Sequence, residues 1–414
     1  MKKRLIFFIT ACFTFSVKAQ QFQTRAQKLI TSEDSLRKGA NSSGTVISGY
    51  GSFFYQRNFE QHQAMVTLDR AVLFVGHKFN EKISLFTELE VEHALVAGNN
   101  SDEHTSGQGD VAIEQAFLKF NLNAHHYLVA GLFTPRIGIT NENHLPVNFN
   151  GVERPLVEQL IIPTTWREIG VGFYGSSDRL PLNYSIAIVN GLNSANFEHD
   201  SGIGEGEGLG SDASANNLAV TASLQYHCID MKFQIAGYAG GTVALSPHGA
   251  DSLGLNSGAF GTPLYLGEAD LQYAKNGIGI KILGTYMAYP EAGKLNAAYA
   301  KNTPSGMYGA YAELGYDFLY QKHGQDQFIA FARAEMLDMN ANTASNGIYD
   351  GTQKQTHIIA GVNYLPIPNI AIKADVRLLH TGPQNPALVI NPAPNALPYK
   401  ENTQFLNIGV GYSF

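Results

Sequence analysis

The stretch FLNIGVGYSF, residues 405–414, decides the fold because, from Leu406 on, apolar side chains alternate strictly with small or polar ones. Extended as a strand, it has an apolar face (Leu406, Ile408, Val410, Tyr412, Phe414) and a small or polar face (Asn407, Gly409, Gly411, Ser413). Such a strand needs an apolar medium on one side and a polar medium on the other. A soluble sandwich also provides this when the apolar face packs on a second sheet, so the rest of the chain must distinguish the two folds.

The N-terminal sequence MKKRLIFFITACFTFSVKAQ is typical of an export signal. Three basic residues precede an apolar run, and Val17 and Ala19 occupy the small-residue positions of a cleavage site. The run is shorter than the ~18 apolar residues of a spanning helix, and no later segment reaches that length. We therefore predict a signal peptide at 1–19, a polar periplasmic N-terminal extension at 20–44 and a transmembrane β-barrel at 45–414.

Composition excludes several classes of protein. The formal net charge of −7 at pH 7 makes the chain a poor nucleic-acid binder. Cys228 is the single cysteine after the predicted signal, so no intrachain disulfide is expected. The mean hydropathy of −0.11 is compatible with a membrane barrel, whose outer apolar and inner polar residues cancel in the average.

Alternation of apolar and polar residues recurs along the chain and predicts about sixteen strands, each long enough to cross a bilayer at a tilt. The expected strands are 45–57, 64–78, 82–94, 110–121, 125–135, 166–176, 181–191, 217–227, 231–243, 264–274, 277–289, 306–320, 326–339, 353–365, 369–381 and 403–414.

Short and long connections between these strands alternate. Short turns such as FNEK (79–82) and HCID (227–230) interleave with long links at 95–109, 135–165, 192–216, 244–263, 290–305, 340–352 and 382–402. This pattern indicates an all-β fold, a transmembrane antiparallel β-barrel of about 16 strands with long external loops and short periplasmic turns. The terminal Phe414 then belongs to the strand that closes the barrel, and it resembles the assembly signal of bacterial outer-membrane barrels.

Charged residues on the clean strands share the parity that faces away from lipid, where an Arg or Lys would cost ~2–4 kcal/mol. We expect these residues to line the pore wall: Glu88, Glu90, Lys281, Arg333, Lys373, Asp375 and Arg377. Acidic and basic residues are mixed among them, so the wall carries no basic ladder of the kind that anion pores use.

Residues 110–175 carry a family resemblance in three stretches, DVAIEQAFLKFNL, HHYLVAGLFTPRIGI and WREIGVGFYG. They resemble the phosphate-selective porin O/P-type family and related Gram-negative porins, whose G-x-F-x-x-P-x-G stretch is matched by Gly131, Phe133, Pro135 or Arg136, and Gly138. The resemblance implies a homotrimer of sixteen-stranded barrels in the outer membrane of a Gram-negative bacterium, with lipid and the barrel assembly machinery as partners. It also implies that the third external loop folds into the channel.

The third external connection, residues 135–165, counted from the one between strands 45–57 and 64–78, is also the longest and agrees with that plan. Its candidate constriction residues carry mixed charge: Arg136, Glu142, His144, Glu153, Arg154 and Glu158. A mixed-charge constriction would screen solutes by charge and size. A solvated surface loop is the alternative.

We therefore expect a porin for passive diffusion of small hydrophilic solutes or ions through a water-filled channel. A substrate-specific anion or phosphate channel, a rim enzyme and an adhesin remain alternatives. Catalytic residues are not expected, because the chain has neither a G-x-S-x-G nor an H-E-x-x-H motif. No cofactor or metal is expected either; Glu88 and Glu90 are interpreted as wall residues rather than as cation ligands.

Overall fold

The computed structural model describes residues 22–31, 44–92, 110–208, 210, 213–322, 324–389 and 398–414. The predicted signal peptide at 1–19, most of the extension at 20–44 and the link at 95–109 lie outside the described residues. Among the described residues, no helix is both long and apolar enough to cross a membrane.

The described residues form sixteen antiparallel strands closed into a barrel, in which each strand pairs with its neighbours in sequence and β1 pairs with β16. The strands are β1 Gly44–Asn58, β2 Gln63–Lys78, β3 Ile83–Glu92, β4 Asp110–Asn121, β5 His126–Phe133, β6 Glu168–Ser176, β7 Leu182–Asn190, β8 Leu218–Cys228, β9 Met231–Gly240, β10 Leu264–Lys275, β11 Ile278–Ala288, β12 Gly306–Asp317, β13 Gln327–Asn342, β14 Lys354–Ile367, β15 Ile370–Thr381 and β16 Asn402–Ser413. The predicted fold class is confirmed, and every expected strand end lies within three residues of the observed one.

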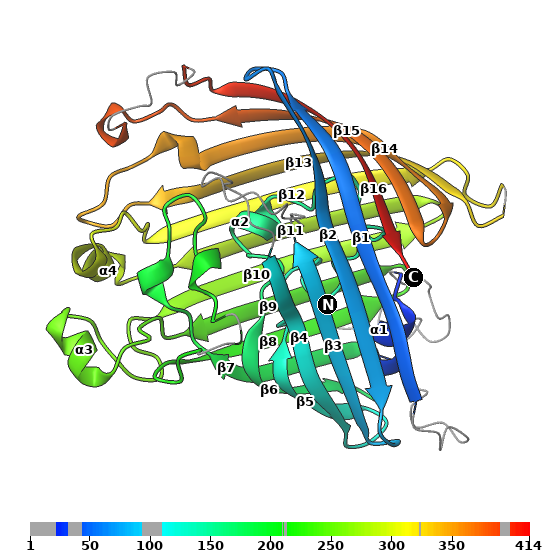
Figure 1. Cartoon of the computed structure of the whole chain (residues 1–414), viewed down its shortest axis with the longest axis horizontal. Coiled ribbons are helices and arrows are strands. Elements are labelled where there is room, and N and C mark those ends of the chain that lie inside the picture. Colours follow the sequence, from blue (N-terminus) through cyan, green and yellow to red (C-terminus); the bar gives the residue numbers. More distant parts are fainter. Residues whose placement is uncertain are drawn as a thin grey trace, which may run out of the picture.

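The helices are short and lie toward the ends of the barrel or, for α2, against its inner face (Figure 1). They are α1 Arg25–Thr31, α2 Val157–Leu160, α3 Pro247–Ser252 and α4 Ala292–Tyr299. The links 244–263 and 290–305, with α3 and α4, lie at one end, whereas α1 lies toward the other end, near the C-terminus (Figure 1). Short turns and long links therefore occupy opposite ends, as the alternation of their lengths predicts.

The two faces of the wall differ as the alternation predicts. On β16, Ile408 is 47% exposed, whereas the next inward residue, Asn407, is 1% exposed. β7 and β15 repeat this pattern, with Ile188 and Leu378 exposed and Ala187 and Lys373 buried. An apolar outer face is the arrangement that a lipid bilayer requires, because charged residues there would be costly.

Closure of the barrel involves the last residue of the chain. Phe414 exchanges two backbone hydrogen bonds with Gly49: the Gly49 N–H donates to the Phe414 carbonyl at 3.0 Å, and the Phe414 N–H donates to the Gly49 carbonyl at 2.9 Å. From Tyr50 opposite Ser413 to Asn58 opposite Phe405, the register then continues without a shift. The β1–β16 pair thus leaves no unpaired sheet edge.

Deletion of Phe414 should impair assembly, because it removes both hydrogen bonds to Gly49 together with an exposed aromatic side chain. Phe414→Ala keeps the backbone pair and should assemble better than the deletion. The measurement is the amount of heat-modifiable protein in purified outer membranes. Wild-type amounts for the deletion variant would show that the last pair is dispensable.

Candidate functional site

The third loop, residues 135–165, lies against the inner face of the barrel, where glycines make room for it. A Cβ atom added to Gly411 would overlap Pro146, and one added to Gly309 would lie 2.7 Å from Val157 Cγ1. An atom added to Gly409 would lie 3.1 Å from Val152 Cγ1. The small residues on the inner face of β16 therefore provide the space that the loop occupies.

Cationic side chains of the wall donate hydrogen bonds to backbone carbonyls of the third loop. Lys373 Nζ lies 2.8 Å from the carbonyl oxygens of both Phe149 and Gly151. Lys281 Nζ donates to the Asn148 carbonyl at 3.1 Å, and Arg333 Nη1 to the Asn150 carbonyl at 3.1 Å. Three of the predicted wall residues thus hold the middle of the loop.

Acidic wall residues bind the backbone N–H groups that follow. The Val152 N–H donates to Asp375 Oδ2 at 2.7 Å, and the Val157 N–H donates to Glu335 Oε2 at 3.1 Å. Between them, Glu153 forms an ion pair with Arg377 at 2.7 Å. Cationic wall groups therefore bind the carbonyl groups of the first part of this segment, and acidic wall groups bind the N–H groups of the part that follows.

Glu158 joins the two ends of the third loop and also links it to the wall. Its Oε2 accepts hydrogen bonds from the backbone N–H groups of Ile139 and Thr140, at 2.8 and 2.7 Å, and from the Thr140 hydroxyl at 2.9 Å. Its Oε1 accepts from the Tyr311 hydroxyl at 2.6 Å. This buried carboxylate is a structural link within the loop rather than a charge exposed to a solute.

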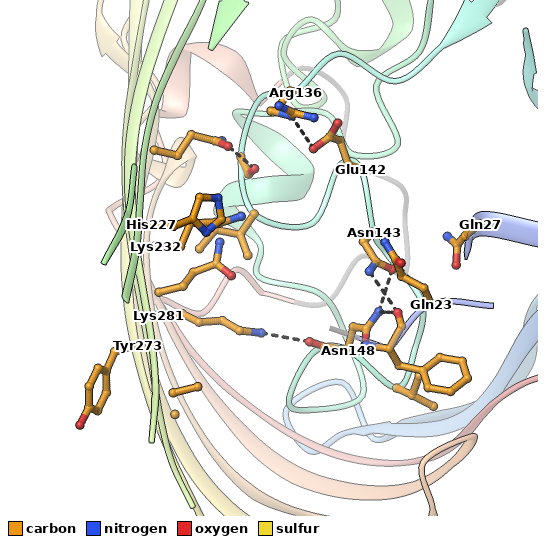
Figure 2. A pocket seen from close by; sticks show the side chains of 18 of the residues that line it. Gln23, Gln27, Arg136, Glu142, Asn143, Asn148, His227, Lys232, Tyr273 and Lys281 are labelled. Carbon is orange, nitrogen blue, oxygen red and sulfur yellow. Dashed lines mark hydrogen bonds and ion pairs between the residues drawn. The ribbon is translucent and has the colours of Figure 1, made fainter. Parts of the chain in front are cut away.

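A cavity of about 1340 Å³ lies between the third loop, the wall and the N-terminal segment (Figure 2). Its polar lining includes Arg136 and Glu142, which form an ion pair at 2.9 Å, and Lys281 and Lys232 from the wall. Arg154 lies outside this lining and borders a second, much smaller cavity of about 10 Å³. Of the six predicted constriction residues, Arg136 and Glu142 are the two that line the large cavity.

Residues 22–31 form the remaining border of the cavity. The Phe22 N–H donates to Asn148 Oδ1 at 2.8 Å, and the amides of Asn148 and Asn143 donate back to the Phe22 carbonyl at 2.8 and 3.1 Å. Ala26 of α1 is buried in an apolar cluster with Tyr50 and Leu145. Sequence reasoning missed these contacts because a helix of seven residues with no clear periodicity gives no signal.

The half of the lumen nearer the long links is apolar rather than polar. A continuous cluster joins buried residues of the third loop, the neighbouring links and the inner wall, among them Ile137, Ile161, Leu192, Phe197, Val243, Leu264, Leu283 and Leu337. Trp166 is fully buried in it and donates its indole N–H to Glu168 Oε1 at 3.0 Å. The expectation of a polar inner face therefore describes only part of the lumen, because apolar inner positions here pack against inserted loops.

His144 of the third loop contacts the carboxyl groups of Glu88 on β3 and Glu114 on β4. Its Nε2 atom lies 3.4 Å from Glu88 Oε1 and 3.5 Å from Glu114 Oε2, and all three residues are buried. Burial alone would lower the pKa of His144, but the two carboxyl groups outweigh it and raise the pKa to about 9. Glu88 was predicted as a wall residue and His144 as a constriction residue; Glu114, far from both in sequence, was not singled out.

Comparison with known proteins gives a relative in sequence and several structures with a similar fold. An uncharacterized protein of Aquifex aeolicus is 30% identical over 347 residues, which cover 80% of this chain and 75% of that protein. No family model matches the chain.

Solved structures with a similar fold are outer-membrane proteins. An anion-selective porin from Comamonas acidovorans aligns with a TM-score of 0.52 at 10% identity and covers 90% of this chain and 100% of that one. OmpF of Salmonella typhi, solved with daunomycin, gives 0.52 at 11% identity, with 91% and 99% covered. The outer-membrane channel DcaP of Acinetobacter baumannii gives 0.50 at 13% identity, with 91% and 99% covered. At these identities the likeness establishes a common fold.

Gly411→Val should destabilise the barrel by about 1–3 kcal/mol, because the new side chain must displace Pro146 of the third loop. Gly267→Val is the matched control, since a Cβ atom there meets nothing within 4 Å. The measurement is the temperature at which the folded form is lost on gels. Equal loss for both variants would contradict close packing of the loop on β16.

Proposed function

The chain belongs to the same family as the Aquifex aeolicus protein, and from its fold and site we propose that it is an outer-membrane channel for passive diffusion of small hydrophilic solutes or ions. The observation that carries this proposal is the third loop, which is hydrogen-bonded to the inner wall beside a cavity of about 1340 Å³. In this proposal the loop narrows the channel, and the protein acts without catalysis. Export by a cleaved signal peptide and a homotrimeric assembly remain part of the same proposal.

Charge at the narrowed region would come from Arg136 and Glu142. Both line the large cavity, and their ion pair at 2.9 Å places one charge of each sign beside any passing ion. Two of the other predicted charges are engaged elsewhere: Glu153 with Arg377, and Glu158 with the loop backbone and Tyr311. Weak intrinsic selectivity follows, because neither sign dominates at the cavity.

Arg136→Gln should shift the reversal potential of the channel in a salt gradient toward cations, because Glu142 then lacks its partner. Glu142→Gln should shift it toward anions. Both shifts should shrink at high salt as the Debye length falls toward ~3 Å at 1 M. The measurement is bilayer conductance of the purified protein.

Arg154→Gln is the control for this pair, since Arg154 carries the same charge on the same loop but does not line the large cavity. It should leave the reversal potential unchanged. If the Arg136 and Glu142 variants also leave selectivity and conductance unchanged, ions do not pass this ion pair, and the proposed constriction is wrong.

A substrate-specific channel is the second candidate, favoured by the aromatic side of the cavity. Tyr127 and Tyr174 stack there with ring centroids 5.1 Å apart and planes 3° apart, and Phe86, Phe117 and Phe133 line the same cavity. Flat aromatic surfaces suit solutes that present an apolar face, such as sugars. Phosphate as the specific solute has less support, because Lys281 and Lys373 are bound to loop carbonyls.

Liposome swelling with a graded series of sugars and ions separates the two candidates. A general channel should give rates that fall smoothly with solute size. A rate that saturates at low concentration for one solute, and that Tyr174→Ala abolishes, would favour the specific channel instead.

A further inference from the structure

We propose that Glu88, Glu114 and His144 form a binding site for a divalent transition-metal ion such as Zn²⁺, which fastens the third loop to the barrel wall. One potential ligand atom from each residue lies within 4.8 Å of the others. The residues come from β3, β4 and the third loop, so one ion would join three parts of the chain. Two carboxylates and one imidazole form a ligand set that zinc accepts, with a fourth position left for water.

The orientation of His144 is the one that a metal ligand requires. Its Nδ1 atom lies 3.2 Å from the Asn141 carbonyl oxygen, so Nδ1 carries the proton and donates it there. When the ring is neutral, this leaves the Nε2 lone pair directed toward the two carboxyl groups, so metal binding would displace the second proton from Nε2. Metal-bound histidines usually donate their other N–H to a carbonyl or carboxylate in this way, which fixes the ring and its tautomer.

The distances within the group fit coordination better than direct hydrogen bonding. Charge-assisted hydrogen bonds from nitrogen to carboxylate span about 2.7–2.9 Å, whereas His144 Nε2 lies 3.4 and 3.5 Å from its two oxygen neighbours. Ligands bound to zinc at about 2.0–2.2 Å in tetrahedral geometry lie about 3.3–3.6 Å apart. The imidazole is therefore spaced from both carboxyl groups as an intervening ion would require.

Glu114 supplies a second observation that points to a cation. Its Oε1 accepts hydrogen bonds from the Thr165 hydroxyl at 2.7 Å and from Arg167 Nη1 at 3.4 Å. Its Oε2 is buried and has no hydrogen-bond partner in the described part of the chain, although it is directed at His144. A buried carboxylate oxygen left without a partner is costly, and a metal ion would satisfy it.

Two of the surrounding arginines are paired with other carboxylate oxygens. Glu90 pairs with Arg70 and Glu114 Oε1 with Arg167, both at 3.4 Å, whereas Glu88 is contacted by the neutral side chains of Gln115 and Tyr50. The alternative to a metal is a proton on His144. A metal ion and a proton at this position can be distinguished by experiment, because only a metal site binds one metal ion per chain.

The site lies next to the large cavity. Gln115 lines that cavity and donates a hydrogen bond to Glu88 Oε2, so one side chain separates the site from the aqueous space. Tyr50 closes the other side, with its hydroxyl 3.4 Å from Glu88 Oε1 and its ring against His144. The ion would thus be shielded from solutes and would act structurally.

The experiment uses the full-length purified protein in detergent, stripped with a chelator and then dialysed against low-micromolar Zn²⁺ or Co²⁺. The wild-type protein should retain one more Zn²⁺ per chain than His144→Gln and Glu114→Gln, and bound Co²⁺ should give the visible absorption of a tetrahedral site. Zn²⁺ should also raise the unfolding temperature of the wild type but not of these two variants. His227→Gln, which changes a histidine that lines the large cavity outside this group, should behave like the wild type.

Two results would overturn the proposal without reference to transport. The first is a wild-type protein that retains no Zn²⁺ and shows no Co²⁺ absorption, which would assign His144 as a protonated bridge between the carboxyl groups. The second is equal binding by wild type and His144→Gln, which would place the metal on other residues. If either glutamine variant fails to fold, the wild-type Co²⁺ spectrum still decides between the metal and the proton.

Discussion

Backbone hydrogen bonding without water is the constraint on which the rest of this structure depends. In the hydrocarbon layer each N–H and C=O group must find a partner within the protein, and a closed barrel provides one for every strand. The β1–β16 pair completes this arrangement, down to the two hydrogen bonds between Gly49 and Phe414. The outer face must be apolar because it contacts lipid. The inner face has no such requirement, so charged residues and glycines can lie there and contact the third loop.

Charged side chains on the inner face of this barrel bind the third loop. Arg333 is buried between Glu313 at 3.2 Å and Glu335 at 2.8 Å, and it also donates to the carbonyls of Asn150 and Glu153. Removing one partner from such a group typically costs about 3–5 kcal/mol, because the remaining charge stays buried. The third loop is therefore a part of the barrel interior and is held there by buried charged groups of the wall.

The regular features of this arrangement could be predicted from the sequence, because they repeat. The period-two alternation of apolar and polar residues predicted each strand. The alternation of link lengths predicted which end of the barrel carries short turns and which carries long links. Lys373 could be placed on the inner face by parity, but its partners, the carbonyls of Phe149 and Gly151, depend on the conformation of an irregular loop. The contact between Glu114 and His144 could not be predicted either, because it depends on the conformation of the same loop.

Apolar inner residues such as Leu264 and Leu337 were unpredictable for a different reason. Alternation requires a contrast between faces, and where inserted links cover the inner wall both faces are apolar. The apolar cluster borders the large cavity at the third loop: Ile137 packs in the cluster, Ile139 belongs to the cluster and also lines the cavity, and Arg136 lines the cavity beside Glu142. Arg136 and Ile137 are thus neighbours in sequence whose side chains have different surroundings, because one forms an ion pair at the cavity and the other packs among apolar side chains.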